Sequence, residues 1–94
     1  MIIILDYGLG NLRSLQTALA GQGIDAKISN DPEEINNAAA IFLPGVGAFR
    51  DASNALWDSG LAELLIKRRD EGVYIIGICL GMQLLYEIGR ASCR

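Results

Sequence analysis

The sequence predicts an α/β fold in which an open parallel β-sheet carries helices on both faces. Four strand-like runs, at residues 2–5, 24–29, 39–43 and 73–78, alternate with stretches of helical periodicity. Glycines and helix-capping residues lie where the two kinds of segment meet. Strands that alternate with helices along a chain pair in parallel, and 94 residues suffice for one core but not for two. We therefore expect a single α/β domain.

The first third of the chain predicts a strand, a helix and a second strand. Residues 2–5 form a continuous apolar run that ends at Asp6, which is typical of a buried strand. Asn11 is a favourable N-cap, the apolar residues after it recur every three or four positions, and Gly23 is a typical helix terminator. Residues 24–29 alternate between apolar and polar, which predicts a strand with one polar face near an edge of the sheet.

The remainder of the chain repeats this alternation. At Asp31 the string DPEE combines an N-cap, a proline at the first helical position and a glutamate at the third, which predicts a short helix. Residues 39–43 predict a buried strand that runs into the glycine-rich loop PGVGAF. Residues 51–71 predict one or two helices broken near Gly60, and residues 73–78 predict a fourth strand with a helix after it.

Composition excludes several classes of function. Apolar residues make up 51% of the chain and charged residues 20%, a balance typical of a globular protein. The net charge is −3, and the one basic cluster, residues 67–69, is predicted to be the last turn of a helix, so nucleic-acid binding is not expected. The apolar start of the chain is too short to span a bilayer and has no signal-peptide features. We expect a cytoplasmic protein that binds neither membrane nor nucleic acid.

The last residues differ from the rest. From Glu87 the sequence continues EIGRASCR, where the helical apolar pattern stops, and this string resembles the in-frame translation of a sequencing adapter. We therefore expect residues 1–87 to be the native part of the domain and residues 88–94 to be a non-native tail. Cys79 is then the only native cysteine.

The stretch GICLG, residues 77–81, is the strongest functional signal in the chain. It matches the nucleophile-elbow form GxSxG with cysteine in place of serine, between a strand and a helix. Flanking glycines remove side chains that would clash at such a turn, and the start of the helix favours a thiolate at Cys79. A lone cysteine is more often an ordinary buried thiol. Here the apolar strand, the paired glycines and the immediate helix favour a nucleophile.

Two further loops are expected on the same edge of the sheet as Cys79. A cysteine nucleophile in acyl transfer needs donors for the oxyanion, and one is normally the N–H of the next residue, Leu80. The loop PGVG, residues 44–47, is placed to supply a second donor, although such a string alone is more often a turn. The loop DYGLGN, residues 6–11, lacks the glycine spacing and the lysine of nucleotide-binding loops.

The chain contains no histidine. A thiol at its ordinary pKa is only about 3% ionised at pH 7, and loss of a positioned base costs roughly 100- to 10,000-fold in rate. The 94 residues alone are therefore not expected to be a competent enzyme. No metal site and no cofactor is expected either.

Three stretches together resemble a known family. MIIILDYGLGNLRSL, LPGVGAFRDA and GICLGMQLLYE are similar to the glutamine amidotransferase subunits of imidazole glycerol phosphate synthase, which are triad-type class I amidotransferases. The resemblance implies a flavodoxin-like sheet and a nucleophile, Cys79, that attacks the side-chain amide of glutamine. It also implies that the amides of Val46 and Leu80 form the oxyanion hole and that Gly47 and Gln83 hold glutamine.

The resemblance further implies a partner and a missing part. Asn11 would face the cyclase subunit, a (β/α)8 barrel that receives ammonia and forms imidazole glycerol phosphate and AICAR in histidine biosynthesis. The catalytic histidine and its acidic partner would lie beyond residue 87. In that case residues 73–78 form an uncovered apolar edge, and we expect the 94-residue product to be poorly soluble and without glutaminase activity.

Two alternatives remain open at this point. One is another α/β enzyme with a cysteine elbow, either a different class I amidotransferase or a relative of cysteine hydrolases. The other is a non-catalytic flavodoxin-like binding module, in which Cys79 would be unreactive.

Overall fold

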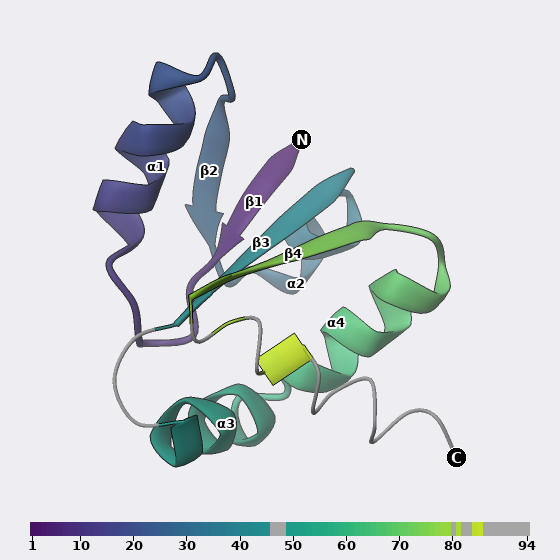
Figure 1. Ribbon diagram of the computed structural model, residues 1–94. Coiled ribbons are helices and arrows are strands. Elements are labelled where there is room, and N and C mark those ends of the chain that lie inside the picture. Colours follow the sequence, from purple (N-terminus) through teal and green to yellow (C-terminus); the bar gives the residue numbers. More distant parts are fainter. Residues whose placement is uncertain (46–48, 80, 82–83, 86–94) are drawn as a thin grey trace.

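The described residues form a four-stranded parallel sheet with helices on both faces, as predicted (Figure 1). The computed structural model describes residues 1–45, 49–79, 81, 84 and 85, with the backbone alone at Phe49 and Cys79. The strands are β1 (Ile2–Leu5), β2 (Ala26–Ser29), β3 (Ala40–Gly45) and β4 (Tyr74–Cys79), in the order β2-β1-β3-β4. The helices are α1 (Leu12–Gly21), α2 (Pro32–Asn36), α3 (Phe49–Asp58) and α4 (Leu61–Asp70). This strand order is flavodoxin-like.

The two faces of the sheet carry separate hydrophobic clusters. On one face α1 packs its leucines against Ile4 of β1, Ala26 of β2 and Phe42 of β3. On the other face α2, α3 and α4 cover a larger cluster that includes Ile3 and Ile41, both fully buried. Because successive strand residues point to opposite faces, a continuous apolar run is needed to fill both clusters.

Local sequence signals set the ends of α1. Asn11 is its N-cap, and the side chain of Asn11 accepts a hydrogen bond from the N–H of Ser14 at 3.4 Å. After the C-cap Gln22, Gly23 adopts a left-handed conformation with φ +81°, which glycine allows without steric cost. Both predicted ends of this helix are confirmed.

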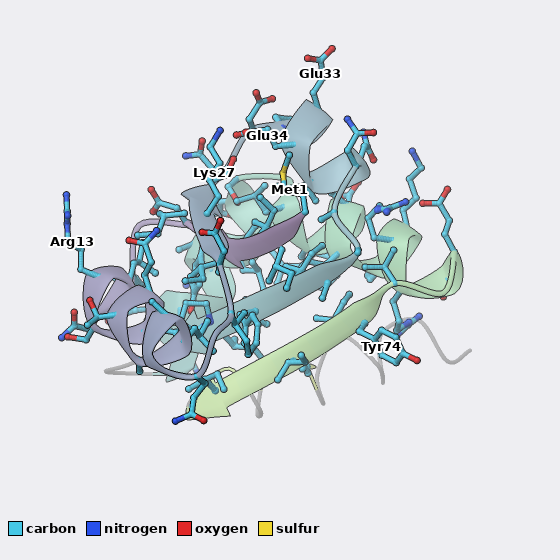
Figure 2. All side chains as sticks on the ribbon, turned by 90° about the horizontal axis from the view of Figure 1, so that it is seen from above. Met1, Arg13, Lys27, Glu33, Glu34 and Tyr74 are labelled. Atoms are coloured by element: carbon cyan, nitrogen blue, oxygen red, sulfur yellow. The ribbon has the colours of Figure 1, made fainter. Side chains whose placement is uncertain are left out.

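The second strand and the second helix are joined by a polar network. Asp31 caps α2, and its side chain accepts a hydrogen bond from the N–H of Glu33 at 3.0 Å. Glu34 accepts hydrogen bonds from Lys27 and from the Ser29 hydroxyl, so the two labelled side chains Lys27 and Glu34 lie close together in Figure 2. Ser29 was expected on the polar face of this strand, and it lies opposite the apolar face but is buried, with its hydroxyl bonded to Glu34.

Two helices rather than one follow β3. The break lies at Gly60, which has φ +80°, and Gly72 closes α4 with φ +91°. The basic residues 67–69 form the last turn of α4, as predicted. Arg68 is held there, because its guanidinium donates to the carbonyl of Ala38 at 2.8 Å and to Glu71 at 2.9 Å.

Two strands are longer at their carboxyl ends than the sequence predicted. The third strand was expected to end at residue 43, but β3 continues through Pro44 and Gly45. The fourth was expected to end at residue 78, but β4 includes Cys79. The two extensions pair with each other, Pro44 with Ile78 and Gly45 with Cys79. Pro44 lies beyond the last residue of β3 that pairs with β1, where a missing N–H is more easily tolerated.

The fourth strand lies at an edge of the described sheet, as expected. Tyr74 is 76% exposed and Ile76 is 40% exposed. Both alternate with Val73 and Ile75, which pack against the cluster under α3 and α4, so Tyr74 and Ile76 lie on the same face of the sheet as α1. They remain exposed because α1 lies beside β2, at the far edge of the sheet from β4 (Figures 1 and 2). Among the described residues, no helix is both long enough and apolar enough to cross a membrane.

Candidate functional site

The carboxyl ends of β1, β3 and β4 meet at one edge of the sheet (Figure 1). Parallel pairing of Gly45 with Cys79 puts the end of β3 directly beside the candidate nucleophile position. Residues 81, 84 and 85 are helical, so a helix follows Cys79 as the elbow motif predicts. Leu84 is 1% exposed and packs in the cluster under α3 and α4, which anchors this helix.

Gly81 shows why the elbow needs a glycine after the cysteine. A Cβ atom at this position would lie 1.8 Å from the carbonyl oxygen of Leu43 and 2.9 Å from its carbonyl carbon. Real Cβ atoms do not approach backbone so closely, and a backbone carbonyl within the sheet cannot rotate away as a side chain could. The helix after Cys79 therefore lies directly against β3 because residue 81 has no side chain.

The loop after β1 is shaped by one turn and two glycines. The N–H of Gly8 donates to the carboxylate of Asp6 at 3.2 Å, which forms a turn of the type favoured by aspartate. Gly8 and Gly10 both have positive φ, +95° and +104°. A Cβ at Gly10 would lie 3.4 Å from the Cβ of Pro44, so this loop packs against the end of β3.

Tyr7 connects the same two segments by a hydrogen bond. Its ring is buried, with 6% of the residue exposed, and its hydroxyl donates to the carbonyl of Pro44 at 2.5 Å. Burial raises the pKa of the Tyr7 hydroxyl above its ordinary value of 10.0, so the group remains a donor at neutral pH. Tyr7 was not among the site residues predicted from the sequence. Its only signal was a tyrosine between Asp6 and Gly8, and the acceptor is 37 positions away.

The predicted site residues fall into two groups. Asn11 and the backbone of Cys79 are described, with Asn11 exposed at the start of α1 and Cys79 at the end of β4. The other predicted site residues lie outside the described residues: Val46, Gly47, Leu80 and Gln83. The roles of all six remain predictions.

A separate hollow of about 330 Å³ lies between α1 and β2. Its lining includes Gln16, whose side-chain amide donates to the carbonyl of Ala26 at 2.9 Å. Ala26 is the first residue of β2, so the hollow is at the opposite end of that strand from the loops around Cys79. It is therefore not part of the candidate site.

Comparison with known proteins gives consistent results. The family model "Glutamine amidotransferase class-I" matches residues 3–92. The chain is 54% identical over 87 residues to the imidazole glycerol phosphate synthase subunit HisH of Caldanaerobacter subterraneus subsp. tengcongensis, and 51% identical over 88 residues to that of Lactococcus lactis subsp. lactis. It also superposes on a crystal structure of a glutamine amidotransferase with a TM-score of 0.71 and 26% identity.

These matches cover most of this chain but less than half of each relative. The alignments span 93% and 94% of the chain, and 43% and 44% of the two HisH subunits. The structural match spans 86% of the chain and 43% of the solved protein. Because the family model matches nearly the whole sequence, the chain belongs to the class-I glutamine amidotransferase family.

Proposed function

We propose that this chain is the nucleophile-bearing part of the glutaminase subunit of an imidazole glycerol phosphate synthase. The main support is the close packing at one sheet edge of the loop after β1, the end of β3 and Gly81, with Gly45 paired to Cys79 and Gly81 against Leu43. This geometry is what an elbow nucleophile beside an oxyanion-binding loop requires. The names of the HisH relatives support the particular synthase.

The proposed reaction is hydrolysis of glutamine through a thioester. The thiolate of Cys79 attacks the side-chain amide carbon of glutamine, and the carbonyl oxygen becomes an oxyanion. Collapse of this intermediate breaks the C–N bond, and the nitrogen leaves as ammonia after taking up a proton. Water then attacks the thioester and releases glutamate and the free thiol.

We assign the remaining site roles to residues on the loops after β3 and β4. The amides of Val46 and Leu80 would stabilise the oxyanion, and Gly47 and Gln83 would hold the substrate. The pairing of Gly45 with Cys79 supports this assignment, since Val46 follows Gly45 and Leu80 follows Cys79 in the chain. Backbone N–H groups suit the role because they are fixed before the charge develops.

The general base must come from outside these 94 residues, which contain no histidine. We therefore propose that residues 1–87 are the N-terminal part of the domain and that 88–94 are a non-native tail. In the experiments below, "the complete subunit" means residues 1–87 continued by the native remainder of the gene. The corresponding C-terminal part of the Caldanaerobacter relative can replace that remainder.

The proposed partner is the cyclase subunit, a (β/α)8 barrel, in a cytoplasmic heterodimer. The cyclase would use the ammonia to form imidazole glycerol phosphate and AICAR, which makes the assembly both a hydrolase and a lyase. Asn11 lies exposed in the loop after β1, at the same sheet edge as Cys79, and this position supports its assignment to the interface.

The test is glutamate release by the complete subunit with its cyclase, compared with Cys79→Ala. We expect the variant to lose at least about 1,000-fold in rate, since a nucleophile is being removed. Covalent labelling by a glutamine-analogue electrophile should likewise disappear in the variant, and glutamine should protect the wild-type protein.

Three results would contradict the proposal or its assignment to this synthase. Glutamate release that persists in Cys79→Ala would show that another group is the nucleophile. Labelling and glutamate release that are both absent from the folded wild-type complex would favour a non-catalytic module. Glutamate release that is stimulated by a different ammonia-using partner protein, and not by the cyclase, would point to another class I amidotransferase.

A further inference from the structure

The hydrogen bond from Tyr7 to Pro44 has no role in the function proposed so far. It joins the loop after β1 to the end of β3, and both partners are buried. The close approach of Gly10 to the ring of Pro44 shows independently that the loop rests on this residue. Two contacts therefore converge on Pro44.

The direction of the Pro44 carbonyl defines the orientation of the peptide plane between Pro44 and Gly45. That carbonyl and the N–H of Gly45 belong to the same planar group, so they rotate together about the ψ bond of Pro44. The proline ring already fixes φ at Pro44, which leaves ψ as the free rotation. Gly45 has no Cβ that could restrict this rotation. Pairing with β4 holds Gly45 from one side. The Tyr7 hydroxyl adds a restraint at the Pro44 carbonyl from the β1 side, where the pairing of β3 with β1 has already ended at Phe42.

The restrained peptide lies beside the candidate nucleophile. Gly45 pairs with Cys79 in the parallel register, and the chain continues from Gly45 directly into the proposed oxyanion segment. A carbonyl whose orientation is fixed sets the direction in which the next residues leave β3. We propose that Tyr7 is a positioning residue for glutamine hydrolysis, whose hydroxyl fixes the Pro44–Gly45 peptide next to Cys79. This inference rests on the proposed function.

The neutral form of Tyr7 suits this role. A phenolate could not donate a hydrogen bond to a carbonyl. Burial raises the pKa of Tyr7, which keeps the proton on the hydroxyl throughout the neutral range. The distance of 2.5 Å lies within the range for O–H···O hydrogen bonds.

The test is Tyr7→Phe in the complete subunit with its cyclase. Phenylalanine keeps the buried ring and removes only the hydroxyl. Because oxyanion donors act on the transition state, we expect kcat and kcat/KM for glutamine to fall together, by about 10- to 100-fold, with KM nearly unchanged. The matched control is Tyr74→Phe, which also removes one phenolic hydroxyl but lies at the opposite end of β4 from Cys79, and we expect it to behave as wild type.

Thermal unfolding of both variants separates positioning from simple stability. Kinetics are measured well below the lower unfolding midpoint, so that each variant is folded. Tyr7→Phe with a lower midpoint but the same kcat as Tyr74→Phe would mean a structural role only, and the inference would be wrong. An inactive wild-type complex would instead refute the proposed function, and the positioning role would fall with it.

Discussion

Replacing Gly81 with alanine tests whether the helix after Cys79 must lie against β3. The added Cβ would lie 1.8 Å from the carbonyl oxygen of Leu43. Ordinary C···O contacts fall at about 3.3–3.6 Å, so the helix and the strand would have to separate by about 1.5 Å. The neighbouring atoms are backbone within a sheet, so no rotamer change can relieve the clash.

The size of the effect follows from this separation. Adding a methyl group to a well-packed region typically costs about 1–3 kcal/mol, and the backbone contact places Gly81→Ala at about 3 kcal/mol. A displacement of about 1 Å in a reacting group can cost about 100-fold in rate. Since Cys79 immediately precedes this helix, we expect glutamate release to fall by about that factor.

Urea denaturation of the complete subunit measures the stability cost, and glutamate release with the cyclase measures the rate. The control is Gly21→Ala, because Gly21 is also helical and a Cβ there meets nothing within 4 Å. Alanine in place of glycine within a helix should stabilise by up to about 1 kcal/mol. If Gly81→Ala unfolds at the same urea concentration as Gly21→Ala, the inferred contact between helix and strand is wrong.

Two other predictions concern a helix cap and an acidic side chain. Asn11→Ala should destabilise the complete subunit by about 0.5 kcal/mol, which is the low end for an N-cap because the bond to Ser14 is long. Asn11→Asp should retain the cap. If Asn11 also contacts the cyclase, a binding titration should show weaker cyclase binding for both variants, although only Asn11→Ala loses the cap. The contacts with Lys27, then Ser29, hold the pKa of Glu34 below its ordinary value of 4.5, so its stabilising effect is present above about pH 4.5 and is lost as the pH falls through the folded-state pKa. The urea midpoints of wild type and Glu34→Gln should therefore differ at pH 7 and converge at low pH. The control is Glu33→Gln. If both variants lower the midpoint by the same amount at every pH, this account is wrong.

Much of the fold could be predicted from local pattern. The continuous apolar run of β1, the cap at Asn11 and the proline start of α2 are signals that act within a few residues. The strand ends could not be predicted in the same way. Pro44 and Gly45 are typical loop residues by composition, and they become strand because β4 runs beside them. Tertiary pairing outweighed local propensity at this point.

The local structure around Cys79 could be predicted from the sequence, but the contacts between its loops could not. The elbow pattern around Cys79 predicted the strand before it and the helix after it, and the close approach of Gly81 to Leu43 explains why the pattern needs its second glycine. The bond from Tyr7 to Pro44 joins residues 37 positions apart. No periodicity or spacing in the sequence predicts such a contact, because it depends on how the loop after β1 packs against the end of β3 once the sheet has formed.

The arrangement of the strands has a consequence for how the chain folds. Ile2 pairs with Ala26 on one side and Ala40 on the other, and Ala40 pairs with Tyr74. Each of these pairings closes a long segment that contains at least one helix, and the described sheet has no hairpin that could form locally. Closing long segments before any pairing is gained raises the barrier to folding. Of the four described strands, the earliest in the sequence is thus a central one, and it must wait for distant residues on both sides.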